Sequence, residues 1–163
     1  DRLRSRGLGD VYKRQKLNRH EIDALMPHGE PFLFIDSAEI GTGSARMKYK
    51  IRGDEFFFKG HFKGNPVFPA TLMLEAVGQL GVLYLLASPD PAIEKPVDPK
   101  KIFFTSSDNA RCSRFCLPGD TLDIELKVSR IRHPLFFFEG RSFVGGERAS
   151  FVEKITLTFD YKS

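Results

Sequence analysis

The sequence predicts an α+β fold in which an antiparallel sheet of about six strands wraps around one long buried helix. Residues 70–87 form an apolar run rich in Leu, Met and Ala, whose length and composition favour a helix. Because the run is apolar on all sides, this helix should lie inside the fold. From residue 102 onward the chain has strand patterns only, whereas a parallel α/β sheet needs helices between its strands. The length of 163 residues suits one domain.

A short helix and two strands are expected before the long helix. Asn18 is a suitable N-cap, and Glu21 follows three residues later, as in a capping box. This helix should run to about Met26, because Pro27 stops it. The next expected elements are a strand at 32–40, a turn at 41–43, a strand at 45–51 and a buried aromatic segment at 56–58.

Loops rich in glycine and proline should flank the long helix. Residues 59–69 contain two glycines and two prolines, and residues 88–99 contain four prolines. Four strands are expected after the second loop, at 102–110, 121–131, 135–144 and 148–161. The second of them alternates apolar and polar residues, which is typical of a strand with one buried face.

The first 16 residues are not expected to belong to the domain, which we place at residues 17–163. They begin with Asp, are rich in Arg and Gly, and lack apolar periodicity. The run at 8–15 resembles the translated scars left by cloning or sequence assembly, so the segment is interpreted as a disordered or cloning-derived tail. The alternative is a genuine basic arm that binds an acidic partner.

Composition argues against several classes of function. The first 16 residues carry six basic and two acidic residues, which leaves the rest of the chain neutral and removes the support for nucleic-acid binding. Cys112 and Cys116 are too few for a disulfide framework or a zinc quartet, and they suggest reduced thiols in a cytoplasmic protein. Glu75 lies inside the only long apolar run, which we therefore interpret as a protein core helix rather than a membrane span.

The segment 60–75 brings together the groups of an acid–base site. His61 lies in the rigid loop before the long helix, and Glu75 should lie in the second turn of that helix. We expect the Glu75 carboxyl to be desolvated by its apolar neighbours, and burial favours the neutral acid, which can donate a proton. A neutral histidine can accept one. Free backbone N–H groups near Ala70 and Thr71 can polarise a carbonyl oxygen. Together these groups suit elimination of water next to a carbonyl group.

The same segment resembles the 3-hydroxyacyl-acyl-carrier-protein dehydratases of bacterial fatty-acid synthesis, which have the hotdog fold. The matching residues are Gly60-His61-Phe62, Gly64, Pro66-Val67, Pro69, Glu75-Ala76 and Gln79 in the centre, Leu25-Met26-Pro27-His28 and Pro31-Phe32-Leu33 upstream, and Asp108-Asn109-Ala110-Arg111 and Pro118-Gly119-Asp120 downstream. The resemblance covers about residues 20–160. The chain departs from the family pattern at Lys63, Ala70 and Thr71.

The resemblance implies a role for each central residue. His61 is similar to the catalytic histidine that handles the α-proton of the acyl thioester, and Glu75 to the acid that protonates the departing β-hydroxyl. The backbone N–H of Ala70 would polarise the thioester carbonyl. The carbonyl of Val67 would orient the His61 ring, and Gln79 would position Glu75. In this family the histidine of one subunit works with the glutamate of the other, so a homodimer or a dimer-based oligomer is implied.

Two further groups of residues are candidates for substrate recognition. A tunnel for the acyl chain would be lined by aromatic and apolar residues, namely Phe58, Phe62, Phe68 and Pro69. Core packing explains such residues equally well. The acidic carrier protein would be steered by basic residues, namely Lys100, Lys101, Arg111 and Arg114, although these could form an ordinary solvated face. The remaining histidines, His20, His28 and His133, are interpreted as structural or exposed.

The resulting hypothesis is a cytoplasmic hydro-lyase that converts (3R)-hydroxyacyl thioesters to trans-2-enoyl thioesters in fatty-acid or related lipid or polyketide biosynthesis. No metal or redox cofactor is implied, since the substrate arrives on the phosphopantetheine arm of its carrier. A nucleic-acid or membrane partner is not expected. Two alternatives stay open: a hotdog acyl thioesterase, and a non-catalytic module that binds acyl groups.

Overall fold

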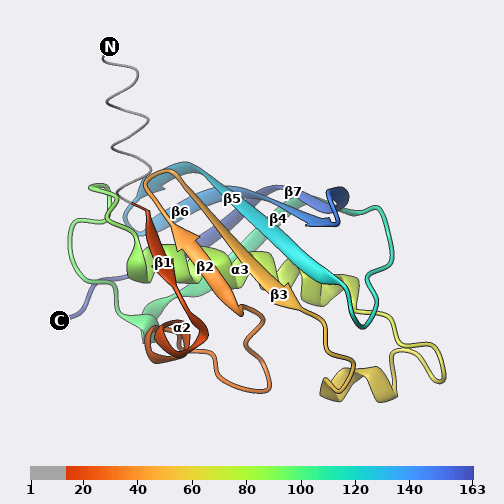
Figure 1. Cartoon of the computed structure of the whole chain (residues 1–163). Coiled ribbons are helices and arrows are strands. Elements are labelled where there is room, and N and C mark those ends of the chain that lie inside the picture. The colour runs from red at the N-terminus through yellow and green to blue at the C-terminus, as the bar shows by residue number, and fades with distance from the viewer. Residues whose placement is uncertain (1–13) are drawn as a thin grey trace, which may run out of the picture.

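The computed structural model describes residues 14–163, and the elements of that part follow one another as Figure 1 shows. The two α-helices are α2 (Arg19–Leu25) and α3 (Ala70–Ala87), and the two 3-10 helices are η1 (Phe56–Lys59) and η2 (Pro99–Lys101). The strands are β1 (Gln15–Leu17), β2 (Ser37–Ile40), β3 (Ser44–Lys50), β4 (Phe103–Cys112), β5 (Thr121–Arg132), β6 (Leu135–Val144) and β7 (Glu147–Thr158).

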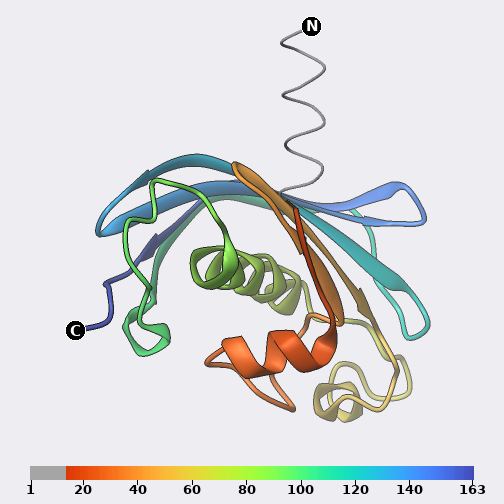
Figure 2. The same ribbon diagram turned by 60° about the vertical axis from the view of Figure 1, so that its left-hand side comes forward.

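Within residues 14–163, one antiparallel sheet holds all seven strands in the order β1-β2-β3-β5-β6-β7-β4. The sheet curves over α3, and α2 lies on the same side (Figures 1 and 2). The predicted α+β architecture, a sheet wrapped around one long helix, is therefore confirmed. Strands such as β3 alternate buried and exposed residues, so one face of the sheet covers the helix and the other faces solvent.

Helix α3 has the predicted bounds and packs tightly against the sheet. A Cβ atom added to Gly140 of β6 would lie 2.3 Å from Cγ1 of Val77, and one added to Gly81 would lie 2.3 Å from the ring of Phe138. Such short distances mean that glycine is needed on one side of each contact. The helix is long and apolar enough to pass a membrane-span test, but more than half of it is buried inside this fold, as expected for a core helix.

The N-terminal capping box is confirmed. The Asn18 side chain accepts the backbone N–H of Glu21 at 2.9 Å, and the Glu21 side chain accepts the backbone N–H of Asn18 at 3.0 Å. These two bonds satisfy backbone donors that a helix leaves free at its start. The helix ends at Leu25, before Pro27, as predicted.

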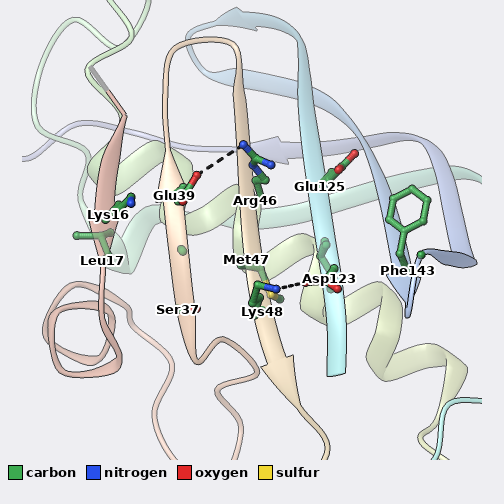
Figure 3. Close-up of a pocket in the computed structure, with 13 residues that line it drawn as sticks. Lys16, Leu17, Ser37, Glu39, Arg46, Met47, Lys48, Asp123, Glu125 and Phe143 are labelled. Atoms are coloured by element: carbon green, nitrogen blue, oxygen red, sulfur yellow. Dashed lines mark ion pairs between the residues drawn. The ribbon is translucent and has the colours of Figure 1, made fainter. Parts of the chain in front are cut away.

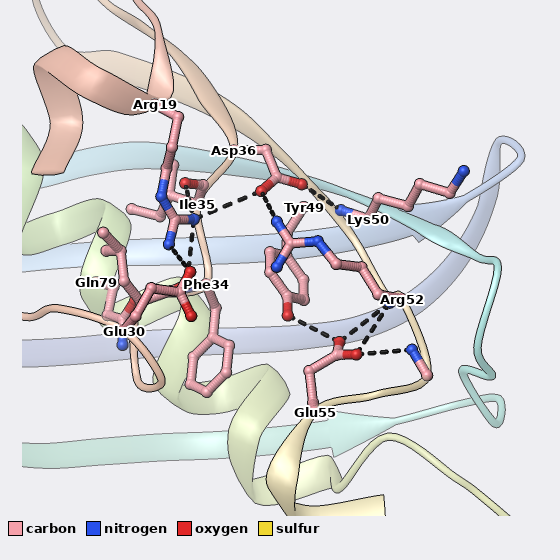
Figure 4. Close-up of polar contacts among 12 residues, drawn as sticks. Arg19, Glu30, Phe34, Ile35, Asp36, Tyr49, Lys50, Arg52, Glu55 and Gln79 are labelled. Carbon is pink, nitrogen blue, oxygen red and sulfur yellow. Dashed lines mark hydrogen bonds and ion pairs between the residues drawn. The ribbon is translucent and has the colours of Figure 1, made fainter.

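The strand predicted at 32–40 is only half right, because pairing begins at Ser37. Before that point the chain leaves the sheet, and side chains supply hydrogen bonds to its backbone. The Arg19 guanidinium donates to the carbonyls of Leu33 at 3.3 Å and Ile35 at 2.9 Å (Figure 4). For residues 33–35, side chains thus supply the hydrogen bonds that a neighbouring strand would otherwise make.

The domain begins earlier than predicted. Gln15 and Lys16, which we had assigned to the tail, form β1 with Leu17 and pair with β2 opposite Ile40 and Glu39. The sheet consequently has seven strands rather than about six. Residues 1–13, where the remainder of the predicted tail falls, lie outside the described residues.

The expectation of a buried segment at 56–58 is wrong in part. These residues form η1, in which Phe58 is buried, Phe57 is half-buried and Phe56 is 56% exposed. A 3-10 helix has three residues per turn, so three successive side chains point in three different directions. They therefore cannot all reach the core.

Candidate active site

The loop before α3 holds the His61 side chain in one orientation. Its Nδ1 lies 2.8 Å from the carbonyl oxygen of Val67, while the Val67 N–H donates to the His61 carbonyl at 3.0 Å. A carbonyl can only accept, so Nδ1 carries a proton, and in the neutral ring Nε2 keeps its lone pair. The Phe62 ring stacks on the imidazole with 3.9 Å between centroids. The loop therefore presents an imidazole whose free nitrogen can act as a base.

His61 lines a cavity of about 650 Å³. Its wall comes from the loop, from the first turn of α3 and from the end of β4, and consists of His61, Phe62, Val67, Phe68, Ala70, Met73, Cys112, Ser113, Arg114 and Phe115. Apart from His61 and Arg114 these side chains are apolar or small. An apolar cavity with few polar groups suits an acyl chain with one reactive end.

The N-terminus of α3 opens onto this cavity. Pro69 is the N-cap and offers no side-chain bond to the helix, while its carbonyl accepts the N–H groups of Leu72 and Met73 at 2.9 and 3.1 Å. The N–H groups of Ala70 and Thr71 precede these and have no partner within a helix. Ala70 replaces the family glycine without strain, because within residues 14–163 Asn109 is the one non-glycine residue with positive φ.

Glu75 lies on another side of α3, away from His61. It follows Met73 by two residues, which rotates it by about 200° around the helix. In the described chain the imidazole within 4.0 Å of its carboxylate is that of His28, at 3.7 Å, rather than that of His61. The side chain of Glu75 is 35% exposed, so the expected desolvation of this carboxyl is not found in a single chain. One chain by itself therefore does not join the predicted acid to the predicted base.

Gln79 fixes the surroundings of Glu75. Its side-chain NH₂ donates to Oε2 of Glu75 at 3.0 Å and to the carbonyl of Phe32 at 3.1 Å, and its carbonyl oxygen accepts the N–H of Phe34 at 2.9 Å. Gln79 is fully buried, and its bond to the N–H of Phe34 is shielded from water, whereas its bonds to Phe32 and Glu75 are partly buried. The extended segment at 32–36 is thus bonded to Arg19 and to Gln79, and both side chains are drawn in Figure 4.

A second hollow, of about 660 Å³, lies on the outer face of the sheet (Figure 3). Four of its charged side chains form ion pairs: Lys48 lies 3.0 Å from Asp123, and Arg46 lies 3.7 Å from Glu39. Opposite charges also alternate across the strand register, in the order Lys16, Glu39, Arg46, Glu125 and Arg141. Cross-strand pairs of this kind stabilise a solvated sheet face. We therefore interpret this hollow as part of a solvated sheet face rather than as a reaction site.

Within residues 14–163, no cluster of three or more His, Cys, Asp or Glu side chains is arranged to hold a metal ion. The two cysteines there are free thiols. Burial raises the pKa of Cys116 to about 11, which keeps this thiol protonated near neutral pH.

The sequence of the chain matches a known protein family. A model of the FabA-like domain matches residues 26–153, which include the His61 loop, α3 and most of the sheet. The chain belongs to the FabA-like family. Among its FabA-like relatives is the 3-hydroxyacyl-[acyl-carrier-protein] dehydratase FabZ of Caulobacter vibrioides, 39% identical over 135 residues, with 82% of each chain covered. The enzyme of that name from Thermomicrobium roseum is 37% identical over 146 residues, covering 88% of this chain and 94% of the relative.

Solved structures confirm the hotdog fold expected for a FabA-like chain. The dehydratase heterocomplex ApeI:P from Xenorhabdus doucetiae matches with a TM-score of 0.68 and 14% identity, over 86% of this chain and 91% of that one. A sigma28-regulated virulence protein from Campylobacter jejuni matches with a TM-score of 0.64 and 12% identity, over 88% and 90% of the two chains. At such low identity the likeness concerns the fold alone.

The four aromatic and apolar residues proposed for substrate binding divide into two groups. Phe62 and Phe68 lie in the cavity wall, whereas Phe58 and Pro69 are buried outside it. Phe68 also packs edge-on against the ring of Phe57 with 5.4 Å between centroids. One aromatic residue therefore serves both the cavity wall and the core of this FabA-like domain.

The proposed basic set is not one patch within the chain. Lys100 and Lys101 precede β4, while Arg111 and Arg114 lie at its other end, about 30 Å away along an extended strand. Arg114 is also committed to acidic partners, since its guanidinium lies 3.0 Å from the Glu147 carboxylate. The strand predicted at 102–110 lies between the two pairs, so the sequence itself already implies this separation.

Sequence reasoning missed part of the cavity wall and one neighbour of Glu75. Cys112, Ser113 and Phe115 line the cavity, and they lie between the two downstream runs, 108–111 and 118–120, on which the family resemblance rests. His28, interpreted as structural or exposed, lies instead beside Glu75. It falls within the upstream stretch of the resemblance, which was the available signal.

Proposed function

We propose that the chain dehydrates (3R)-hydroxyacyl thioesters of acyl carrier protein to trans-2-enoyl thioesters, as a hydro-lyase of fatty-acid or related lipid or polyketide biosynthesis. The names of the relatives support this substrate class. The single observation that carries the proposal is the His61 imidazole, which Val67 holds with its free nitrogen beside a cavity at the open end of α3.

The reaction follows from these groups. Nε2 of His61 removes the proton from C2 of the acyl chain, and the electron pair forms the C2–C3 double bond as the C3–O bond breaks. Glu75 gives its proton to the departing hydroxyl, which leaves as water. The N–H of Ala70 donates to the thioester oxygen, where negative charge develops. Val67 maintains the tautomer of the base, and Gln79 orients the acid.

A second copy of the chain completes this site in our proposal. Strand β4 is at the edge of the sheet, and nine of its ten residues are exposed in the single chain. Phe103, Phe104 and Phe115 along this edge are 69%, 47% and 73% exposed. A cover is favoured over a long exposed edge strand that carries large apolar side chains. Antiparallel pairing of two β4 strands would provide it and would bring Glu75 of one copy to His61 of the other.

The same pairing suggests how the acidic carrier is recruited. In an antiparallel pair the start of one β4 lies beside the end of the other. Lys100 and Lys101 of one copy would then approach Arg111 and Arg114 of the second copy. A cationic rim of this kind steers an acidic partner by long-range attraction. The substrate's own phosphopantetheine arm enters the cavity. We expect the enzyme to act in the cytoplasm, without a metal or redox cofactor and without a nucleic-acid or membrane partner.

The decisive assay uses a 3-hydroxyacyl thioester of acyl carrier protein, with the coenzyme A thioester in parallel. Formation of the enoyl thioester, seen by its absorbance, is the expected result. Release of free thiol would indicate a thioesterase instead, and binding without turnover would indicate an acyl-binding module.

Two substitutions test the assigned groups. His61→Ala and Glu75→Gln should each lower turnover by at least about 10²-fold, because each removes a proton-transfer group. Both variants should keep the wild-type circular dichroism spectrum and oligomeric state. Normal turnover in either variant would show that the corresponding group was misassigned.

The assembly is tested by Phe103→Lys, which places a charge on the apolar edge. Light scattering should show a shift from dimer toward monomer, together with a parallel loss of turnover. Phe143→Lys is the matched control, because Phe143 lies beside the outer hollow. A dimer that persists unchanged in Phe103→Lys would refute pairing through β4.

A further inference from the structure

Glu75 has an imidazole beside it other than the proposed base. Nε2 of His28 lies 3.7 Å from Oε2 of Glu75, the same oxygen that accepts a hydrogen bond from Gln79. In the part of the chain that the structure describes, neither a hydrogen bond nor an ion pair engages the other oxygen, Oε1. The two carboxyl oxygens thus have different surroundings before any substrate arrives.

The segment that carries His28 is fixed at both ends. On one side Met26 is buried, and its N–H closes α2. On the other side the N–H of Phe32 donates to the carbonyl of Gly29 at 2.8 Å, and the carbonyl of Phe32 accepts the amide of Gln79 at 3.1 Å. The turn with His28 is therefore tied to the same residue that holds Glu75.

The surroundings of His28 select one form of its ring. Its Nδ1 is buried and has no hydrogen-bond partner among residues 14–163. Burial lowers the pKa of His28 and outweighs the attraction of Glu75, which acts in the opposite direction. The neutral ring carries one N–H, and a buried acceptor without a partner is tolerated better than a buried N–H donor without one. The proton therefore belongs on Nε2, facing Glu75.

We propose that His28 is a positioning residue for Glu75: the Nε2–H of its ring and the amide of Gln79 together hold Oε2, so that Oε1 presents the transferred proton to the substrate. This inference rests on the proposed function, because it assigns an orientation to the proposed acid. Proton transfer depends on such orientation, since the acid must lie within hydrogen-bond reach of the departing oxygen. A shift from 3.7 Å to bonding distance needs less than 1 Å of side-chain motion.

A matched pair of substitutions tests the donor role. The side chains in His28→Gln and His28→Met have similar length and shape, but only glutamine offers an N–H where Nε2 stood. With the acyl-carrier-protein substrate, kcat of His28→Met should fall about tenfold while KM changes less than about twofold. His28→Gln should keep kcat within about twofold of wild type. Equal kcat values in the two variants would overturn the proposal, because His28 would then only fill space.

A spectroscopic measurement tests the contact without activity. Two-bond ¹H–¹⁵N spectra of the histidine rings in the full chain report which nitrogen is protonated. We expect the Nε2–H form for His28 at neutral pH, and a shift of its Nε2 resonance in Glu75→Gln. An Nδ1–H form, or a resonance indifferent to Glu75→Gln, would overturn the inference. An inactive wild-type enzyme would instead refute the proposed function, so the two failures are distinguishable.

Discussion

The two sides of helix α3 meet different surroundings. Toward the sheet the contacts are apolar and leave no spare volume, as between Val77 and Gly140. Away from the sheet, Glu75 and Gln79 meet the polar backbone of the segment at 32–36 and the ring of His28. The sheet side fixes where the helix lies, and the other side carries groups that a core would exclude. Stability and chemistry are thus placed on separate faces of one helix.

The largest combined effect on stability and turnover is expected on the polar side, at Gln79. Gln79→Leu leaves the buried N–H of Phe34 without its partner, removes the bond to the partly buried carbonyl of Phe32, and frees Glu75. We expect a loss of about 3 kcal/mol in the free energy of unfolding, measured with urea, and a clear fall in kcat. Leu80→Met is the control, since this volume-conserving change at a neighbouring buried position should cost less than about 1.5 kcal/mol. Equal losses in both variants would contradict a special role for the amide.

On the sheet side, Gly140→Ala should lose about 2 kcal/mol through overpacking, because its new Cβ meets Val77. Kinetics should change less than in Gln79→Leu, since no polar group is removed. The double variant Gly140→Ala/Val77→Ala should recover part of the lost stability. Additive losses in the double-mutant cycle would show that the contact does not limit packing.

The pH dependence of stability sharpens the contrast, because His28 is on the polar side. Its pKa is lower in the folded chain than the usual 6.5, so the unfolded chain binds a proton more readily at mildly acidic pH. Stability is therefore complete above pH 6.5 and declines as pH falls toward the lower pKa of the folded state. His28→Gln should have a flatter dependence of Tm between about pH 7.5 and 5.5 than wild type. Parallel curves for the two proteins would argue against a buried neutral ring.

The smallest effect is expected on the outer face of the sheet. Arg46 lies 3.7 Å from Glu39, and its side chain is 56% exposed. Arg46→Gln should change the free energy of unfolding by less than about 0.5 kcal/mol and leave kcat unchanged. A large loss of activity in this variant would indicate that the outer hollow has a function after all.

The elements best predicted from sequence are those defined by their own residues. Helix α3 has its predicted bounds because Pro69 precedes its apolar run and Pro89 follows it. The bond from His61 to Val67 was also anticipated, since both residues belong to one rigid loop and to one family motif. Local rules and a specific resemblance suffice where partners lie close along the chain.

The features that were missed depend on partners distant in sequence. Residues 32–36 have a strand-like composition, but Arg19 and Gln79 bond their backbone from far along the chain. Likewise, His28 and Glu75 are 47 positions apart, and no periodicity links them. Most of the short strand β1 falls in a basic segment whose composition differs from that of the domain. Its pairing with β2 shows that β1 is part of the sheet. These relationships exist only once the sheet has curved around the helix.

The close contacts at Gly81 and Gly140 fix the position of the whole of α3 beneath the sheet. Gly81 lets the ring of Phe138 approach the helix axis, and Gly140 receives Val77, so the helix can neither slide nor roll beneath the sheet. Gly81 is 11 residues from Ala70, or about 16 Å along the axis. A bulkier residue at position 81 would meet the ring of Phe138, and we expect the resulting shift of the helix to move the backbone N–H of Ala70, which we propose to bind the thioester oxygen.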